Sequence, residues 1–182
     1  MKNDFLRDRK TAWAITCAVA VLSVLLGGAR SLGRLRSEAS DVFFNGTAGD
    51  GMGISRELER CAEYAYNMLT VANRYIPDDE AVKKLESTRG ELIDSASIAD
   101  KSANGRKLID SAAALYDRLG GAKLTETDAK YRESLHADIK ARSNIILNDG
   151  YNREAREFNK KLAAFPANLI KTLRLATELP EF

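Results

Sequence analysis

The sequence predicts an all-α protein, with an N-terminal transmembrane helix followed by an antiparallel four-helix-type bundle of long helices. Three observations predict it. An uncharged apolar stretch lies near the N-terminus, apolar residues recur every three or four positions along most of the remaining chain, and no segment sustains a period of two. Long amphipathic helices joined by short turns pack most readily as an antiparallel bundle.

Composition permits a folded domain and argues against one class of partner. Of the 182 residues, 45% are hydrophobic, an ordinary share for a globular protein. Beyond the first ten residues, a basic flank, positive and negative side chains balance at 24 each. A neutral body lacks the basic footprint that binding to a phosphate backbone requires, so we expect no nucleic-acid partner.

The membrane anchor is the uncharged stretch at residues 11–29. As a helix these 19 residues span roughly 28 Å, close to the hydrocarbon thickness of a bilayer. Trp13 lies near one end, where an indole suits the interface. The basic flank slightly exceeds the arginines after the segment, so we expect a single-pass protein with an extracytoplasmic bundle. The alternative is a signal peptide cleaved after Ala29, since Gly27 and Ala29 are suitably small.

The chain after the anchor divides into a helical stalk at 30–44, a Gly-rich linker at 45–54 and a bundle domain at 55–182. Ser55 is the expected N-cap of the first bundle helix, and Pro77 stops it. The apolar stripe of this helix recurs at helical spacing. Its members are Leu58, Ala62, Ala65, Leu69, Ala72 and Ile76.

Caps and glycines divide the next part of the chain. A second helix opens at Asp78 or Asp79, and Asn104-Gly105 indicates a break or kink in it. Gly120-Gly121 predicts its end, and Thr125 the start of another helix. We therefore expect short turns between long helices.

The last helix carries a coiled-coil-like seam with spacing 4, 3, 4, 3. Its residues are Tyr151, Ala155, Phe158, Leu162 and Phe165. Pro166 then opens a final short turn or helix. Asn152 and Asn159 each follow a seam aromatic, and a buried amide there needs hydrogen-bond partners. Two interpretations stay open for them: control of helix register and contact with a partner.

The chemistry-bearing residues form no recognisable site. His136 is the single histidine, and we expect it on the bundle surface. Cys17 and Cys61 lie on apolar segments and are expected to be free thiols. With one histidine and two separated cysteines, a zinc site would need an unusual carboxylate set, and a di-iron site would need a second histidine. We therefore expect no catalytic residues, no cofactor, no metal and no enzymatic activity.

A family resemblance rests mainly on the last third of the chain. Residues 151–159 read Tyr-Asn-Arg-Glu-Ala-Arg-Glu-Phe-Asn, and residues 165–170 read Phe-Pro-Ala-Asn-Leu-Ile. This order resembles the signature of the LemA family, and residues 58–75 are similar to that family's first long helix. The resemblance implies a bacterial, membrane-anchored antiparallel bundle and supplies no catalytic residues. Asn148, where the family commonly has Arg, and the Gly-rich insert at 45–53 indicate a divergent branch.

The sequence therefore predicts a non-enzymatic interaction module anchored at the bacterial cell envelope. Its expected partners are the lipid bilayer and unidentified membrane or envelope proteins. The alternative is a self-associating, membrane-organising homo-oligomer that uses Gly27-Gly28, the alanines of the anchor and the seam. The candidate register or partner-contact residues are Tyr151, Asn152, Phe158, Asn159, Phe165 and Pro166.

Overall fold

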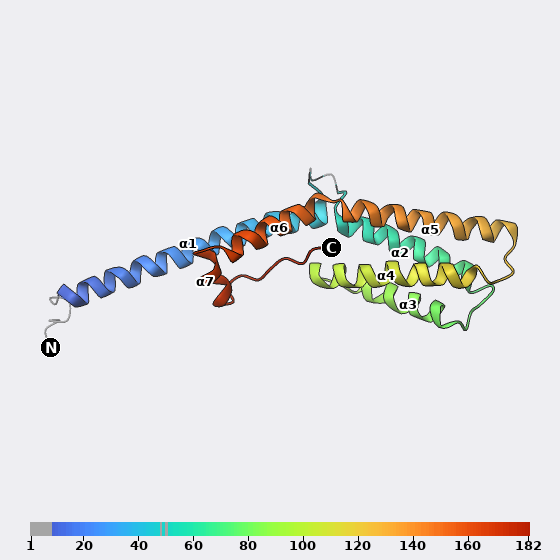
Figure 1. Ribbon diagram of the computed structural model, residues 1–182, viewed down its shortest axis with the longest axis horizontal. Helices are drawn as coiled ribbons and strands as arrows, with labels where there is room; N and C mark the ends of the chain where they lie inside the picture. The colour runs from blue at the N-terminus through green and yellow to red at the C-terminus, as the bar shows by residue number, and fades with distance from the viewer. Residues whose placement is uncertain (1–8, 48, 50) are drawn as a thin grey trace. The chain divides into compact units, whose positions relative to one another are not determined.

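The computed structural model describes residues 9–47, 49 and 51–182, which form two compact units (Figure 1). The anchor unit comprises the described residues 9–38 together with 157–178. The bundle unit comprises the described residues of 39–156 together with 179–182. Within the described chain every regular element is a helix, so the all-α prediction is confirmed.

The bundle unit is built around four antiparallel helices, α2 to α5. Helix α2 packs against each of the other three. The helices α1 and α6 contribute residues to both units, and α7 belongs to the anchor unit. The helix bounds are α1 (Arg9–Asn45), α2 (Ile54–Ala72), α3 (Glu80–Ile93), α4 (Ile98–Leu119), α5 (Glu126–Leu147), α6 (Gly150–Ala163) and α7 (Ala167–Thr172).

The predicted apolar stripe of α2 lies in the bundle core. Its members from Leu58 to Ala72 are buried, whereas Ile76 lies beyond the end of the helix and is half-buried. The prediction for the start of this helix is wrong. Gly53 is the N-cap, and Ser55 lies in the first turn with its side chain buried. Close packing of the loop before α2 moves the helix start to the glycine.

The other helix ends follow the local signals in the sequence. The Asp79 carboxylate accepts a hydrogen bond from the Ala81 backbone N–H at 2.9 Å. The Thr125 hydroxyl accepts one from the Asp128 N–H at 3.2 Å. Helix α4 ends just before Gly120. These predictions are confirmed, because capping depends on residues only a few positions apart.

The predicted break at Asn104-Gly105 is wrong. Both residues lie inside α4, and the true break precedes Ser97, whose hydroxyl caps α4 by accepting from the Asp100 N–H at 3.0 Å. A Cβ at Gly105 would lie 2.5 Å from Leu58 Cδ2. The glycine thus permits close approach of α2 and α4 instead of ending a helix.

The Gly-rich segment makes a close turn between α1 and α2. Gly46 and Gly51 have φ of 78° and 73°, and the Gly51 N–H donates to the Asn45 carbonyl at 2.9 Å. A Cβ at Gly53 would lie 2.5 Å from the Phe43 carbonyl oxygen. Glycine is therefore required here for backbone conformation and for contact. Residues 48 and 50 of the predicted linker lie outside the described residues.

The anchor unit holds the one described helix, α1, that is long and apolar enough to cross a membrane. Its apolar side chains between Trp13 and Leu26 are mostly exposed, with Trp13 at 64% and Leu26 at 69%. No other helix of the described residues covers them. Exposed apolar surface of this extent is typical of contact with lipid.

Candidate functional site

The six sequence-predicted site residues fall in different units. Tyr151 and Asn152 belong to the bundle unit, whereas Phe158, Asn159, Phe165 and Pro166 belong to the anchor unit. The first pair is buried and binds a segment far away in the sequence. It forms the candidate site.

Tyr151 is fully buried at the start of α6, within the bundle unit. Its ring packs edge-on against Phe43 of α1, with centroids 5.0 Å apart and planes at 74°. Its hydroxyl donates to the Pro180 carbonyl oxygen at 2.7 Å. Asp149 fixes this turn by accepting from the Tyr151 backbone N–H at 2.7 Å. The tyrosine therefore joins the bundle core to the last residues of the chain.

Asn152 uses both ends of its buried amide. Its Nδ2 donates to the Ile146 carbonyl at 3.1 Å and to the Leu147 carbonyl at 3.4 Å, at the end of α5. Its Oδ1 accepts from the Phe182 backbone N–H at 2.8 Å. The amide thus adds a side-chain donor to two carbonyls at the end of α5, where the helical hydrogen bonds run out. The expected need for partners is confirmed, whereas register control stays a prediction.

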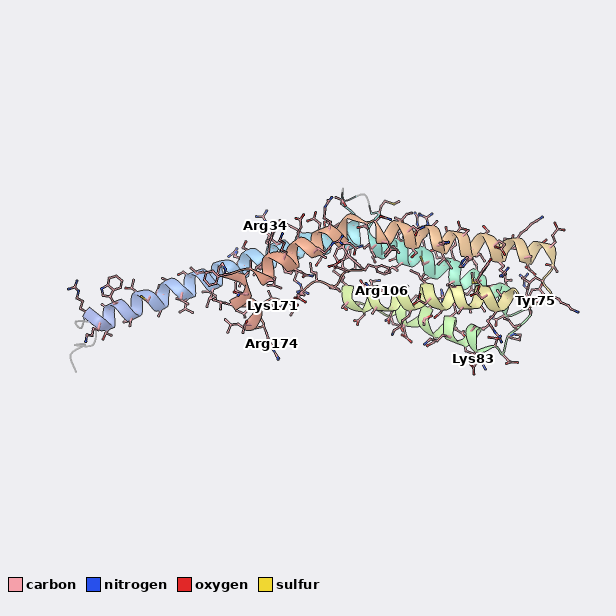
Figure 2. The ribbon with its side chains drawn as sticks, viewed as in Figure 1. Arg34, Tyr75, Lys83, Arg106, Lys171 and Arg174 are labelled. Atoms are coloured by element: carbon pink, nitrogen blue, oxygen red, sulfur yellow. The ribbon has the colours of Figure 1, made fainter. Side chains whose placement is uncertain are left out.

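Helix α4 supplies the other side of the site (Figure 2). Arg106 donates from Nη2 to the Glu181 carbonyl at 2.6 Å, and its guanidinium lies 5.3 Å from the centroid of the Phe182 ring. A Cβ at Gly105 would lie 3.1 Å from that ring. We call Gly105, Arg106, Tyr151 and Asn152 the clasp, and residues 179–182 the tail.

The clasp recognises an extended backbone. Side chains bind one main-chain group on each of three consecutive tail residues: the carbonyls of Pro180 and Glu181 and the N–H of Phe182. Leu179 is buried and Phe182 half-buried, which adds apolar contact at each end. In peptide recognition, main-chain hydrogen bonds supply affinity and contacts of the alternate side chains supply selectivity.

The predicted seam is correct for four of its five residues. Tyr151, Ala155, Phe158 and Leu162 are buried, but Phe165 is 80% exposed. Helix α6 ends at Ala163, just before Pro166, so the helical spacing no longer applies at Phe165. Pro166 is the N-cap residue of α7, and Asn159 is half-buried.

The surfaces predicted for self-association are used within the chain. A Cβ at Gly28 would lie 2.7 Å from Ile170 Cδ1, so α7 already packs against the surface of α1 at this glycine. The seam residues from Tyr151 to Leu162 are buried in their own units. Gly27 stays open, with nothing within 4 Å of a Cβ built there, and Phe165 at the end of the seam is exposed.

Histidine and cysteine take structural environments in the bundle. The half-buried His136 ring stacks on Tyr116, with centroids 4.0 Å apart. Burial raises the pKa of the Cys61 thiol to about 12, so it stays protonated and unreactive at neutral pH. Both cysteines are free. In the described chain no three His, Cys, Asp or Glu side chains group as a metal site would require.

Sequence reasoning identified Tyr151 and Asn152 but not the residues they bind. Arg106 lies on an exposed helix face, and the tail has no periodicity. The one available signal in the sequence was the amide of Asn152 beside a seam aromatic. A buried amide needs hydrogen-bond partners, but the sequence does not identify them. Scans against protein-family models and searches of characterised proteins and of solved structures find no match to this chain. The LemA resemblance therefore stays a prediction.

Proposed function

We propose that this chain is a non-enzymatic interaction module of the LemA type, anchored by α1 in a bacterial membrane, with the bundle on the extracytoplasmic side. The clasp carries the proposal, because it is a built binding surface for an extended segment. The buried carboxylates elsewhere in the bundle, Glu57 and Asp128, each pair with an arginine. Glu57, for example, accepts from Arg142 at 3.1 Å. Pairing of this kind supports a structural role for these charges.

The clasp supports binding of partner segments that resemble the tail. Such a segment would be extended, apolar at positions matching Leu179 and Phe182, and free to offer the same carbonyl and N–H groups. In the absence of a partner the tail fills the surface. A partner with more favourable side chains would displace it, which makes the bundle a receptor whose own tail competes for the site.

The test uses the full chain in detergent micelles with a labelled peptide that copies residues 176–182 and is capped at both ends. Leu179→Ser with Phe182→Ala weakens the tail, and we expect this variant to bind the peptide while the parent binds little. Adding Asn152→Ala should abolish binding, because the amide acceptor is lost. Asn159→Ala is the matched control and should not change binding. If the weakened-tail variant does not bind the peptide, the clasp is a structural contact and not a binding site for partners.

Topology is tested separately. Met52 lies exposed in the turn after α1, and Met52→Cys in a Cys17→Ser, Cys61→Ser background offers one accessible thiol. An impermeant thiol reagent should label this variant on intact cells. Protection until lysis would place the bundle in the cytoplasm.

Self-association is the alternative function, and the open Gly27 on α1 is the observation that favours it. Cys17 is exposed on the same helix, so close pairing of two copies should give an oxidative cross-link through this thiol. A monomer under oxidising conditions in membranes would count against it.

A further inference from the structure

The burial pattern along α1 divides the helix into two parts. From Ala12 to Val24 every side chain is exposed. Beginning at Leu25, side chains on one face of α1 become half-buried or buried within the anchor unit. These residues are Leu25, Gly28, Ala29, Leu32, Leu35 and Arg36. The apolar residues 11–26 span about 24 Å as a helix, slightly less than a hydrocarbon core.

The segment that covers the second part of α1 is α7 with the residues that follow it. Ile170 is buried and packs at Gly28, where a Cβ would come within 2.7 Å of Ile170 Cδ1. Further along, Arg36 donates from Nη1 to the carbonyl and hydroxyl oxygens of Thr177. This segment therefore runs along α1 from Gly28 to Arg36. Its contact with α1 thus begins just after residues 12–24, the part of α1 in which every side chain is exposed.

The segment around α7 exposes several large apolar side chains. Phe165 is 80% exposed, and Leu169, Leu173 and Leu175 are each at least 46% exposed. Four large apolar side chains within eleven residues form an unusual patch for a surface that meets only water. Ile170, next to Leu169, contacts α1 at Gly28, two residues after the exposed Leu26 of the apolar stretch.

Cationic side chains accompany the apolar patch. Lys171 and Arg174 lie on α7 and in the turn after it (Figure 2), and Lys160 and Lys161 are exposed at the end of α6. Lys171 also pairs with Glu178. Aromatic and leucine side chains next to lysine and arginine are typical of helices that lie in a membrane interface and attract anionic headgroups.

Arg174 stands where the backbone favours glycine. Its φ is 57°, and its N–H donates to the Lys171 carbonyl at 2.9 Å. The Leu175 N–H donates to the Ile170 carbonyl at 3.1 Å. Together these bonds form the left-handed C-terminal cap that glycine usually provides. A strained backbone at a charged residue points to a use for the charge.

We propose that residues 165–175 lie in the interface of the membrane that α1 crosses, as a lipid-binding segment. Phe165, Leu169, Leu173 and Leu175 enter the boundary between headgroups and acyl chains, while Lys171 and Arg174 contact anionic headgroups. The inference rests on the membrane anchoring proposed above. It adds a second contact with the same bilayer, which would restrict rotation and tilt of the anchor unit.

The test uses the full chain in vesicles of phosphatidylcholine with phosphatidylglycerol. In a Cys17→Ser, Cys61→Ser background, Leu173→Cys carries an environment-sensitive fluorophore. Ser37→Cys is the matched control, since this exposed α1 residue lies about 15 Å along the helix from Gly27. We expect a blue-shifted emission at position 173, quenching by headgroup-labelled lipids and protection from iodide. Position 37 should stay open to iodide.

Quenching of Trp13 by lipids labelled in the acyl chain reports the anchor independently. If Trp13 is quenched and position 173 is as open to iodide as position 37, the interfacial segment is disproved and the anchor stands. If Trp13 is not quenched, the anchoring proposal fails and this inference falls with it. Lys171→Gln with Arg174→Gln should lower the shielding of position 173 to its value in pure phosphatidylcholine vesicles. Unchanged shielding would disprove the role of the cations.

Discussion

The two units of the chain use the same residue types in opposite surroundings. In the bundle unit Leu85 and Leu115 are fully buried by other helices, whereas in the anchor unit Leu22 and Leu173 are each 56% exposed. Apolar surface of either kind must leave water to stabilise a structure. The bundle unit removes it by packing helices together, and the anchor unit has too little chain to do so. The difference supports the proposal that protein covers the apolar surface of the first unit and lipid that of the second.

The largest expected effect comes from removing one buried side chain in the bundle. Leu115→Ala should lower the free energy of unfolding by about 3 kcal/mol, because it deletes apolar contacts and leaves a cavity. Leu22→Ala is the matched control in the anchor unit and should change the bundle by less than about 0.5 kcal/mol. Denaturant unfolding followed by circular dichroism in detergent measures both. Equal effects would remove the distinction between the two units.

The second effect contrasts the two aromatic–asparagine pairs. Asn152→Ala should lower the free energy of unfolding by about 2 kcal/mol, because helix-end carbonyls and a tail N–H lose their buried partner. Asn159→Ala in the anchor unit should have a smaller effect, since Asn159 is only half-buried. Hydrogen exchange gives a second measurement: the Phe182 amide should lose protection in Asn152→Ala alone. Retained protection would mean that the tail is held without this amide.

The helices of the bundle could be predicted from the sequence because their signals are local. Asp79 and Thr125 cap helices through hydrogen bonds to residues two or three positions away. The α2 stripe has a period that does not depend on which helices cover it. These features can therefore be predicted without knowledge of the tertiary structure.

The clasp and the exposed patch depend on partners that the sequence does not reveal. Glycine at position 105 suggests a helix break from the sequence alone. In the structure it lies inside α4, where its missing side chain lets Leu58 and Phe182 come close to the helix. Phe165 fits the seam spacing, yet α6 ends before reaching it. Asn152 and Phe182 are 30 residues apart with no periodic relation. Nonlocal packing decides the cases of Gly105 and Asn152, whereas the end of α6 before Pro166 decides that of Phe165.

A third prediction concerns pH and the network at the other end of the bundle. Hydrogen bonds from the Tyr75 hydroxyl, at 2.6 Å, and from Thr125 hold the pKa of Asp128 below its ordinary value of 3.8, with help from Arg74. A lowered pKa in the folded state stabilises the bundle above about pH 3.8, and this stabilisation is lost as the pH falls through the lowered value. Tyr75→Phe should therefore raise the pKa of Asp128 and destabilise the bundle at neutral pH, with the difference from the parent vanishing in acid.

Carboxyl NMR of Asp128 and acid unfolding measure this effect. Tyr66→Phe, at an exposed tyrosine of α2, is the matched control and should leave both curves unchanged. The bundle unit alone should respond, so fluorescence from Trp13 in the anchor unit should not follow the titration. An unchanged pKa in Tyr75→Phe would assign the stabilisation of the carboxylate to Thr125 and Arg74.

The smallest effect is a gain in stability in the anchor unit. Arg174→Gly should stabilise the end of α7 by about 1 kcal/mol or less, because glycine adopts a φ of 57° without the clash that a Cβ causes. Slower exchange of the Arg174 and Leu175 amides measures it. Arg174→Lys is the matched control, since it keeps both the charge and the unfavourable backbone and should leave the exchange rates unchanged. If glycine gives slower exchange but weaker shielding of position 173 in anionic vesicles, the arginine is retained for lipid contact at the expense of helix stability. Equal shielding would leave the strained backbone without that explanation.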